Sequence, residues 1–411
     1  MRQLGRRVLT PLFVLSTAVL VTLTGPQQAV AERSAAIAQD ARLAGDRERT
    51  RFIADLSKKV DVNVFALGNP YRVIVDAADV SFQMPEGIGN EKRGLVTAFR
   101  YGLFAPGKSR IVLDLSGPFL IDRSFVLGAR DDQPARLVID LVPTDEKTFL
   151  AALKDQRSKT TETETVERPQ AVEPSDDAKP VVVLDPGHGG VDPGAKSANG
   201  VQEKEVVLAF AKLLRQKLED TDRYQVFLTR DDDTFLPLKE RVKFAREKGA
   251  GLFVSLHADY FPAEIDDARG ATVFTLSEEA SDEEARALAA KENFSDAIAG
   301  VELPKDSDEV VTNILIDLAQ RETNNRSVVM ARSIVGELAA KGRLHTKQLR
   351  SAGFRVLKAP DVPSVLLELG FLSNEEDEKQ LTSETWRERM AGAISDAVDN
   401  YFKQRMAQAP F

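Results

Sequence analysis

The sequence contains no cysteine, one tryptophan and only three histidines among its 411 residues. The lack of cysteine excludes disulfides and thiol chemistry, so a metal site in this chain would have to use His, Asp or Glu side chains. Acidic residues outnumber basic ones by 64 to 55, and the formal net charge of −9 argues against nucleic acid as a partner. Candidate chemistry therefore rests on the few histidines and the carboxylates around them.

Long apolar runs are scarce as well, and one lies near the start of the chain. The stretch from Val8 to Leu23 is uncharged and mostly apolar; arginines precede it, and the small residues Ala29-Val30-Ala31 follow. It is short for a membrane span, which needs about 20 apolar residues, so we expect residues 1–31 to be a cleaved signal peptide that leaves no transmembrane anchor. Adjacent arginines at positions 6 and 7 leave both the Sec and the Tat export routes open.

The remaining sequence divides into regions of different periodicity. Domains usually span about 100–200 residues, so the length of the chain predicts two folded units and a linker. After an N-terminal lead-in at 32–57, apolar and polar residues alternate over 58–145, which predicts an all-β domain, either an antiparallel sheet or a sandwich. Residues 146–179 are rich in Thr, Glu and Pro and predict a flexible linker. Short apolar strands then alternate with amphipathic helices over 180–406, which predicts an α/β domain whose sheet is covered on both faces.

The α/β region has a predicted order of strands and one unusual insertion. The apolar segments expected to form strands are 181–185, 224–230, 252–259, 271–276, 355–359 and 364–371. The acidic, helical segment between the fourth and the fifth of them is much longer than an ordinary connection. We therefore expect 277–340 to contain a helical insertion that covers another part of the domain.

One short pattern recurs three times in the β region. An arginine is followed four residues later by an aspartate in Arg72-Val-Ile-Val-Asp76, Arg110-Ile-Val-Leu-Asp114 and Arg136-Leu-Val-Ile-Asp140. On a strand these two side chains share a face, so the repeat predicts either a surface suited to a polar polymer or simply a solvated outer face.

The candidate site begins with the motif DPGHGG at 185–190. This motif directly follows an apolar strand, which puts His188 on a loop at the carboxyl end of the sheet, where α/β proteins bind ligands. His257 ends another strand in SLHAD, and Glu203 lies in the first turn of the helix after the DPGHGG loop. Two imidazoles and one carboxylate make a three-ligand set with an open fourth position, as catalytic zinc requires. Taken singly, His188 could be a structural histidine, and Glu203 an acid favoured by the helix dipole.

Two further titratable residues need separate interpretation. Glu368 interrupts the apolar strand in VLLELGF, and a glutamate is costly to bury without a partner or a function. Beside a zinc-activated water it would act as a general acid/base; the alternative is a structural ion pair with Arg230 or Arg241. His345 lies in the basic stretch GRLHTKQLR without a carboxylate motif, so we expect it to be a surface histidine.

Five stretches, taken in order, resemble the zinc-dependent N-acetylmuramoyl-L-alanine amidases. They are DPGHGG, GVQEKEVVLAF, FLTRDDDTFLPLKERVKFA, SLHAD and VPSVLLELGFLSN. The resemblance implies a mixed, mainly parallel sheet, one Zn2+ held by the three ligands named above, and Glu368 as the catalytic acid/base. It implies hydrolysis of the amide between N-acetylmuramic acid and L-alanine of the peptidoglycan stem peptide. Supporting or substrate-site candidates within these stretches are Arg230, Arg241 and Asn374.

The β region resembles the AMIN module of Gram-negative cell-division amidases, which implies a periplasmic protein that binds peptidoglycan and acts in daughter-cell separation. The same resemblance implies that the helical insertion occludes the zinc site until an activator with a LytM domain displaces it. Glu292, in LAAKENFSDAI, is our candidate for the residue that fills the open metal position; the alternative is a glutamate on the helix surface. Two other functions stay open, a non-catalytic peptidoglycan-binding scaffold and a zinc peptidase that acts within the stem peptide.

Overall fold

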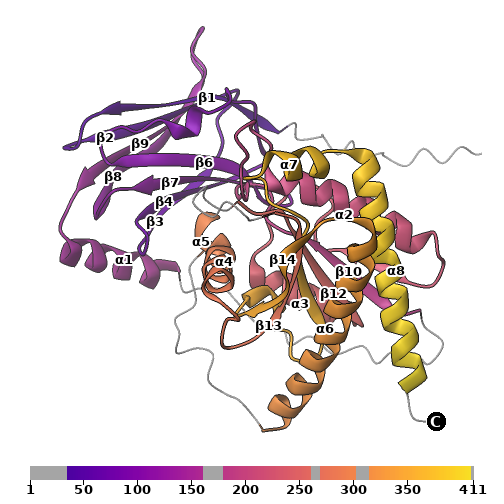
Figure 1. Ribbon diagram of the computed structural model, residues 1–411. Helices are drawn as coiled ribbons and strands as arrows, with labels where there is room; N and C mark the ends of the chain where they lie inside the picture. Colours follow the sequence, from indigo (N-terminus) through magenta and orange to yellow (C-terminus); the bar gives the residue numbers. More distant parts are fainter. Residues whose placement is uncertain (1–34, 161–178, 261–268, 302–313, 409–411) are drawn as a thin grey trace, which may run out of the picture. The chain divides into compact units, whose positions relative to one another are not determined.

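The computed structural model describes residues 35–160, 179–260, 269–301 and 314–408 (Figure 1). The expected signal peptide therefore lies outside the described residues. Within these ranges, no helix is both long enough and apolar enough to cross a membrane. The strands of the described chain form three sheets, two from its first part and one from its second.

The first part of the chain is a sandwich of two sheets. Its strands are β1 (Ala36–Gly45), β2 (Thr50–Leu56), β3 (Val62–Leu67), β4 (Arg72–Ala78), β5 (Val80–Phe82), β6 (Val96–Ala105), β7 (Lys108–Leu115), β8 (Phe119–Leu127) and β9 (Ala135–Pro143). One sheet has the order β5-β1-β2-β9-β8 and the other β3-β4-β7-β6, and only β1 and β5 pair in parallel. Phe52 and Ile139 from one sheet share a core with Val73 and Leu113 from the other. The predicted all-β domain is thus confirmed as a sandwich.

Two boundaries of this domain differ from the prediction. The lead-in at 32–57 contains β1 and β2, where small residues such as Ala38 are buried; alanine marks a buried face only weakly in a sequence pattern. The expected linker at 146–179 begins with helix α1 (Glu146–Thr160), because Phe149 packs into the sandwich core. The remainder of the expected linker up to residue 178 lies outside the described residues.

The second part of the chain forms a six-stranded sheet in the order β11-β10-β12-β15-β13-β14. Its strands are β10 (Val181–Pro186), β11 (Gln225–Leu228), β12 (Leu252–His257), β13 (Ala271–Leu276), β14 (Leu344–Ala352) and β15 (Ser364–Glu368). All neighbours are parallel except β13 and β15, which confirms the mixed, mainly parallel sheet. The flanking helices are α2 (Glu203–Glu219), α3 (Leu238–Glu247), α4 (Glu283–Asn293), α6 (Ile314–Lys341), α7 (Glu375–Leu381) and α8 (Glu384–Gln408).

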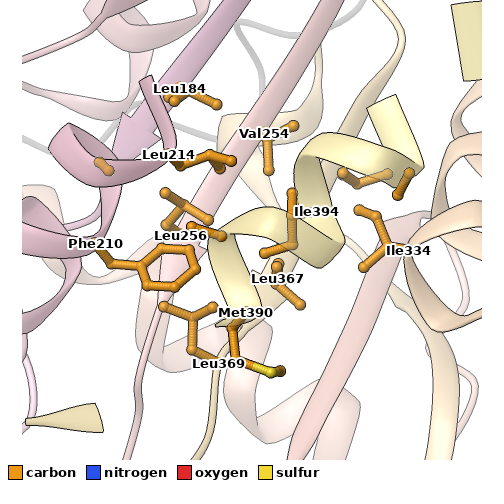
Figure 2. Close-up of a cluster of buried hydrophobic side chains, with 14 of the residues drawn as sticks. Leu184, Phe210, Leu214, Val254, Leu256, Ile334, Leu367, Leu369, Met390 and Ile394 are labelled. Atoms are coloured by element: carbon orange, nitrogen blue, oxygen red, sulfur yellow. The ribbon is translucent and has the colours of Figure 1, made fainter. Parts of the chain in front are cut away.

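Successive residues of the central strands face two different helical layers. Leu184 and Leu256 point into a core that they share with α2, α6 and α8, to which Phe210 and Met390 belong (Figure 2). Val183, next to Leu184 in the same strand, lies instead in the core formed with α3 and α4. Because side chains alternate along a strand, the continuous apolar runs serve both faces, and the sheet is buried on both sides.

Two expectations about the α/β region need correction. The strand predicted at 355–359 is wrong, because a short 3-10 helix, η3 (Arg355–Leu357), lies there. The strand that was missed is β14, at one edge of the sheet, and its polar sequence LHTKQLRSA is typical of an edge. The described part of the insertion expected within 277–340 contains the helices α4, α5 (Ser295–Ile298) and α6. However, α6 is a core element of the domain, since Ile334 packs against the sheet.

Candidate metal centre

The carboxyl ends of neighbouring strands bring the candidate residues together. His188 follows β10 by two residues, and β10 pairs in parallel with β12, which ends at His257. On the next strand, β15, Glu368 is the register partner of His257. Glu203 begins α2, the helix that follows the His188 loop. Residues far apart in sequence therefore meet at the carboxyl end of the sheet, as their positions after apolar strands predicted.

His188, Glu203 and His257 converge on one point. Nε2 of His188 lies 3.2 Å from Oε2 of Glu203, and Nδ1 of His257 lies 3.1 Å from Oε1 of the same carboxylate. The imidazole centroids are 5.1 Å apart, with the rings at 79° to each other. One ligand atom from each residue lies within 4.8 Å of the other two, and all three residues are buried. The three predicted ligands thus form one compact cluster.

The donor set and its spacing fit a zinc ion. Zinc binds imidazole nitrogen and carboxylate oxygen at about 2.0–2.2 Å, and a tetrahedral arrangement then sets neighbouring ligand atoms about 3.3 Å apart. The separations of 3.2 and 3.1 Å are close to this value. In addition, Nε2 of His188 is buried without a hydrogen-bond partner among the described residues. A cation at the cluster would satisfy this nitrogen, whose burial is otherwise costly.

The loop that carries His188 has a strained backbone and little room. His188 has a φ of 58°, a left-handed conformation that residues with a side chain rarely adopt and that often marks a functional site. Gly194 passes so close that a Cβ atom there would lie 2.6 Å from the His188 ring and 2.7 Å from Oε2 of Glu203. Only glycine can therefore occupy position 194 without pushing two ligands out of place.

Two buried arginines hold this loop. Arg241 donates to the carbonyl oxygens of Pro186 and His188 at 2.8 and 2.7 Å and to the carboxylate of Asp185 at 2.9 Å. Arg230 donates to the carbonyl oxygen of Pro186 at 3.0 Å and also to that of the next residue. Both guanidinium groups thus donate hydrogen bonds to the backbone of the DPGHGG loop. Arg230 and Arg241, the supporting candidates from the sequence, therefore hold the backbone that carries His188.

Hydrogen bonds orient the ligand side chains from behind. Nδ1 of His188 lies 2.8 Å from the carboxylate of Asp192, and a proton shared there leaves Nε2 free to face the cluster. Glu203 accepts hydrogen bonds from the backbone N–H groups of Ala195 at 2.8 Å and Ala258 at 2.9 Å. These contacts fix the orientations of the His188 and Glu203 side chains independently of a bound metal.

The charges around the cluster favour a cation. Burial opposes the charged form of His188, but the surrounding carboxylates, Glu203 foremost, outweigh burial and raise the pKa of His188 well above its usual value. Burial also favours the neutral form of Glu203, yet His188 and His257 lower the pKa of Glu203 well below its usual value. The cluster thus stabilises positive charge at its centre, which a divalent cation can supply.

Glu368 lies beside the cluster in the fully buried strand β15. Its Oε2 accepts a backbone N–H from the loop after β12 at 3.1 Å, whereas its Oε1 is buried without a partner in the part of the chain that the structure describes. Burial, and then the charges of Glu203 and Glu292, raise the pKa of Glu368 well above its usual value. The alternative of an ion pair with the two arginines is wrong, because both contact the DPGHGG loop instead. A carboxyl group with a raised pKa and a free oxygen can accept and release a proton.

Glu292, at the end of α4, lies on the remaining side of the cluster. Its Oε2 is 3.4 Å from Nε2 of His188 and 3.2 Å from Nδ1 of His257. The side chain is only 5% exposed, so it is not the surface glutamate of the alternative interpretation. Its Oε1 is buried and has no hydrogen-bond partner among the described residues.

Polar contacts fix the segment around Glu292 to the site. Lys291 pairs with Asp259, and Ser295 donates to Asp192, the carboxylate that orients His188. The cavity left between this segment and the ligands has a volume of about 10 Å³, which is room for about one water molecule. In this arrangement the cluster is closed to a peptide or a sugar.

His345 and Asn374, two other candidates from the sequence, make contacts that stabilise the fold. The expectation that His345 is a surface histidine is wrong, because the residue is buried, its Nδ1 accepts the N–H of Lys347 at 3.0 Å, and its ring packs against Phe371. Burial lowers the pKa of His345 accordingly. Asn374 accepts two backbone N–H groups in the first turn of α7, so it caps this helix.

Sequence reasoning missed four residues that position the site. Asp192, four residues after His188, and Asp185, at the end of an apolar strand, had local signals in their spacing and in their apolar surroundings. Lys291 and Ser295 had none, because their contacts depend on where the helical segment folds.

Comparisons with known proteins agree with this geometry. Residues 182–400 match the family model described as N-acetylmuramoyl-L-alanine amidase. The chain is 35% identical over 368 residues to N-acetylmuramoyl-L-alanine amidase AmiC of Escherichia coli O6:H1, with 86% of each chain covered. It is 34% identical over 417 residues to AmiC of Neisseria meningitidis serogroup B, covering 97% of this chain and 96% of the relative. It is also 43% identical over 225 residues to AmiA of Escherichia coli K12, covering 54% of this chain and 76% of the relative. With a family model spanning more than half of its length and two relatives matched almost end to end, the chain belongs to the N-acetylmuramoyl-L-alanine amidases.

Proposed function

We propose that this amidase cleaves the bond between N-acetylmuramic acid and L-alanine of the stem peptide with one zinc ion held by His188, Glu203 and His257. The observation that supports it is the convergence of three ligand atoms beside a buried carboxyl group with an unpaired oxygen. When bound, zinc supplies Lewis acidity, which polarises the amide carbonyl and makes water a nucleophile near neutral pH.

The chain's own residues handle the proton and the geometry. Oε1 of Glu368 accepts a proton from the attacking water and returns it to the amine nitrogen, which leaves an amide only when protonated. The raised pKa of Glu368 suits it to hold this proton between the two steps. Asp192, through Nδ1 of His188, keeps the imidazole aimed at the cluster while the charges change.

We propose in addition that the resting enzyme is inhibited by its own helical segment, α4 and α5. The carboxylate of Glu292 takes the side of the cluster that water and substrate need, and the cavity there has a volume of about 10 Å³. The resemblance to cell-division amidases suggests that a partner with a LytM domain moves the segment. It also suggests that the sandwich is an AMIN-like module that binds peptidoglycan, and that the enzyme separates daughter cells in the periplasm.

Product analysis tests these proposals. Purified sacculi are incubated with zinc-loaded wild type, Glu292→Ala and Glu368→Gln, and the soluble products are analysed by mass spectrometry. Glu283→Ala serves as the matched control, because Glu283 lies on the exposed face of the same helix with its side chain 80% exposed. We expect sugar-free peptides with an unblocked N-terminal alanine, most from Glu292→Ala, and a loss of about 10²–10⁴-fold for Glu368→Gln.

Each alternative has its own outcome. Peptides cut within the stem would identify a zinc peptidase. No release by any variant, with zinc binding and wall binding retained, would identify a scaffold. Equal release by wild type and Glu292→Ala would contradict the inhibitory role of Glu292.

A further inference from the structure

The repeated arginine–aspartate pattern of the sandwich divides between its two sheets. Arg72 and Arg110 lie on the neighbouring strands β4 and β7 of the four-stranded sheet, and both are buried. Arg136, from the third copy, lies on β9 of the other sheet, and its side chain is 33% exposed. The same local pattern therefore has different surroundings. Neither the solvated outer face nor the open polymer surface expected from the sequence describes the first two copies.

The buried arginines bind the end of the inhibitory segment. Arg72 donates to the carbonyl oxygen of Ala297, and Arg110 donates to those of Ala299 and Gly300, both at 3.0 Å. Arg100, on the adjacent strand β6, donates to the carbonyl oxygen of Ile298 at 2.6 Å. These four carbonyls belong to the last turn of α5 and the residues after it, where most carbonyl groups of a helix lack an internal donor; that of Ala297 also accepts the N–H of Gly300 at 3.0 Å. Three guanidinium groups of the sheet thus pair a run of four consecutive carbonyl oxygens.

The guanidinium groups are themselves held in place. Asp76 binds Arg110 through both oxygens at 2.6 and 2.7 Å, and Asp114 binds Arg100. The Arg110 guanidinium also lies over the ring of Phe104, 3.4 Å from its centroid. Such fixed, charged donors make strong hydrogen bonds at little entropic cost.

Apolar packing completes the contact. Ala299 belongs to a buried cluster with Ile74 and Val112 of the sheet and Phe235 of the α/β domain. Gly300 has a φ of 71°, and a Cβ atom there would collide with Ile74 and lie 3.3 Å from Val112. The end of the segment therefore fits against the sheet without space for a further methyl group.

We infer that the four-stranded sheet of the sandwich is a clasp that holds the inhibitory segment over the metal cluster. Glu292 lies five residues before Ala297, and Ser295 between them contacts Asp192 beside His188. The segment is thus held at one end by the cluster and at the other by the arginines, and release of Glu292 requires this clasp to open. The inference rests on the proposed inhibitory role of Glu292.

Hydrogen exchange on the full-length protein tests the clasp without relying on activity. The backbone N–H groups of Ile298, Ala299, Gly300 and Val301 are hydrogen-bonded within the segment, so their protection reports its order. In Arg100→Ala/Arg110→Ala, where Asp76 and Asp114 regain solvent, we expect their exchange to accelerate about tenfold or more. Arg136→Ala is the matched control, since it removes an arginine of the same repeat that pairs with Asp55 on the other sheet.

A second variant approaches the contact from the other side. Gly300→Ala leaves every guanidinium in place and pushes the segment off the sheet, so it decides the question if the double variant does not fold. Both variants should also raise peptide release from sacculi towards the level of Glu292→Ala, while Arg136→Ala should match wild type. Unchanged exchange in both variants would overturn the clasp, as would faster exchange without increased release when Glu292→Ala is active. Faster exchange together with equal release by wild type and Glu292→Ala would show that the sheet holds the segment, but it would refute the proposed inhibitory role on which the clasp depends.

Discussion

Arg241 offers a direct test of how buried hydrogen bonds support the DPGHGG loop, which carries His188. The residue is 1% exposed and donates to Asp185, to the carbonyl oxygens of Pro186 and His188, and to that of Leu236. Arg241→Met keeps the length of the side chain and removes every one of these donors. The variant leaves the buried carboxylate of Asp185 without its ion-pair partner and takes a donor from three carbonyl groups, of which that of Pro186 keeps the hydrogen bond from Arg230.

The expected loss can be worked out from these contacts. Breaking one side of a buried ion pair costs about 3–5 kcal/mol, and an unpaired buried carbonyl costs about 1–3 kcal/mol. The losses overlap, and Asp185 keeps hydrogen bonds from Thr229 at 2.6 Å and Ser255 at 2.7 Å. We therefore expect the free energy of unfolding to fall by about 3–5 kcal/mol, a large part of the roughly 5–15 kcal/mol that stabilises a typical domain. Adding Asp185→Asn removes the stranded charge and should restore about 1–3 kcal/mol.

The single tryptophan provides the assay. Trp386 is the only tryptophan of the chain and lies in the core between the sheet and α8, so its fluorescence follows unfolding of the α/β domain alone. Urea titrations of metal-free wild type, Arg241→Met and Arg241→Met/Asp185→Asn give the three free energies. A loss below about 1 kcal/mol in Arg241→Met, or a double variant no more stable than the single one, would refute the reasoning.

Three further predictions concern the ligand orientation, the inhibitory segment and the core. Asp192→Ala should weaken zinc binding by about 10–100-fold in a chelator competition, because Nδ1 of His188 loses its partner; an unchanged affinity would contradict this. Asp282 caps α4 and pairs with Arg350. Burial opposes the negative charge of Asp282, but these two contacts outweigh burial and lower the pKa of Asp282 below its usual 3.8. Its stabilising effect is thus present above this value and lost as the pH falls further, so Asp282→Asn should cost about 1 kcal/mol near pH 7 and less near pH 3 in thermal melts. Phe210→Ala should destabilise the α/β domain by about 3–5 kcal/mol by urea titration, since its ring fills the core of Figure 2, and a cost near zero would mean that the core refills the space.

The catalytic side of the site was predictable because its residues follow apolar strands. His188, His257 and Glu368 each stand at or just after the end of such a run, and the carboxyl ends of parallel strands meet at one sheet edge. Glu203 was predictable for a related reason, since the helix after a strand starts at the same edge. Local periodicity thus predicted most strands of this domain and the place of the candidate ligands.

Elements without that local signal were missed. β1 buries alanines, and β14 lies at the sheet edge with a polar sequence, so neither has the apolar alternation of a typical strand. The three arginine–aspartate copies are alike in sequence, yet two are buried against α5 and one is half exposed. Only contacts between residues roughly 190–225 positions apart separate them, and no window of sequence contains such a contact.

The charges of the cluster also connect the proposed inhibition by Glu292 to metal binding. Glu292 brings a third carboxylate to a site that already holds Glu203 and the neighbouring Glu368, and like charges at this spacing repel. A cation among them reverses the sign of the interaction, so its presence favours the position of Glu292 that the structure shows. This effect is reciprocal by linkage. If the bound cation favours the closed position of Glu292 by some factor, then that position raises the affinity for the cation by the same factor. An event that moves Glu292 away from the site must therefore lower the affinity for the metal by the same factor. His188, Glu203 and His257 must then be held rigidly enough to retain the metal without Glu292. The buried arginines under the DPGHGG loop and Asp192 behind His188 provide this rigidity, because neither set of contacts includes the carboxylate that has to leave.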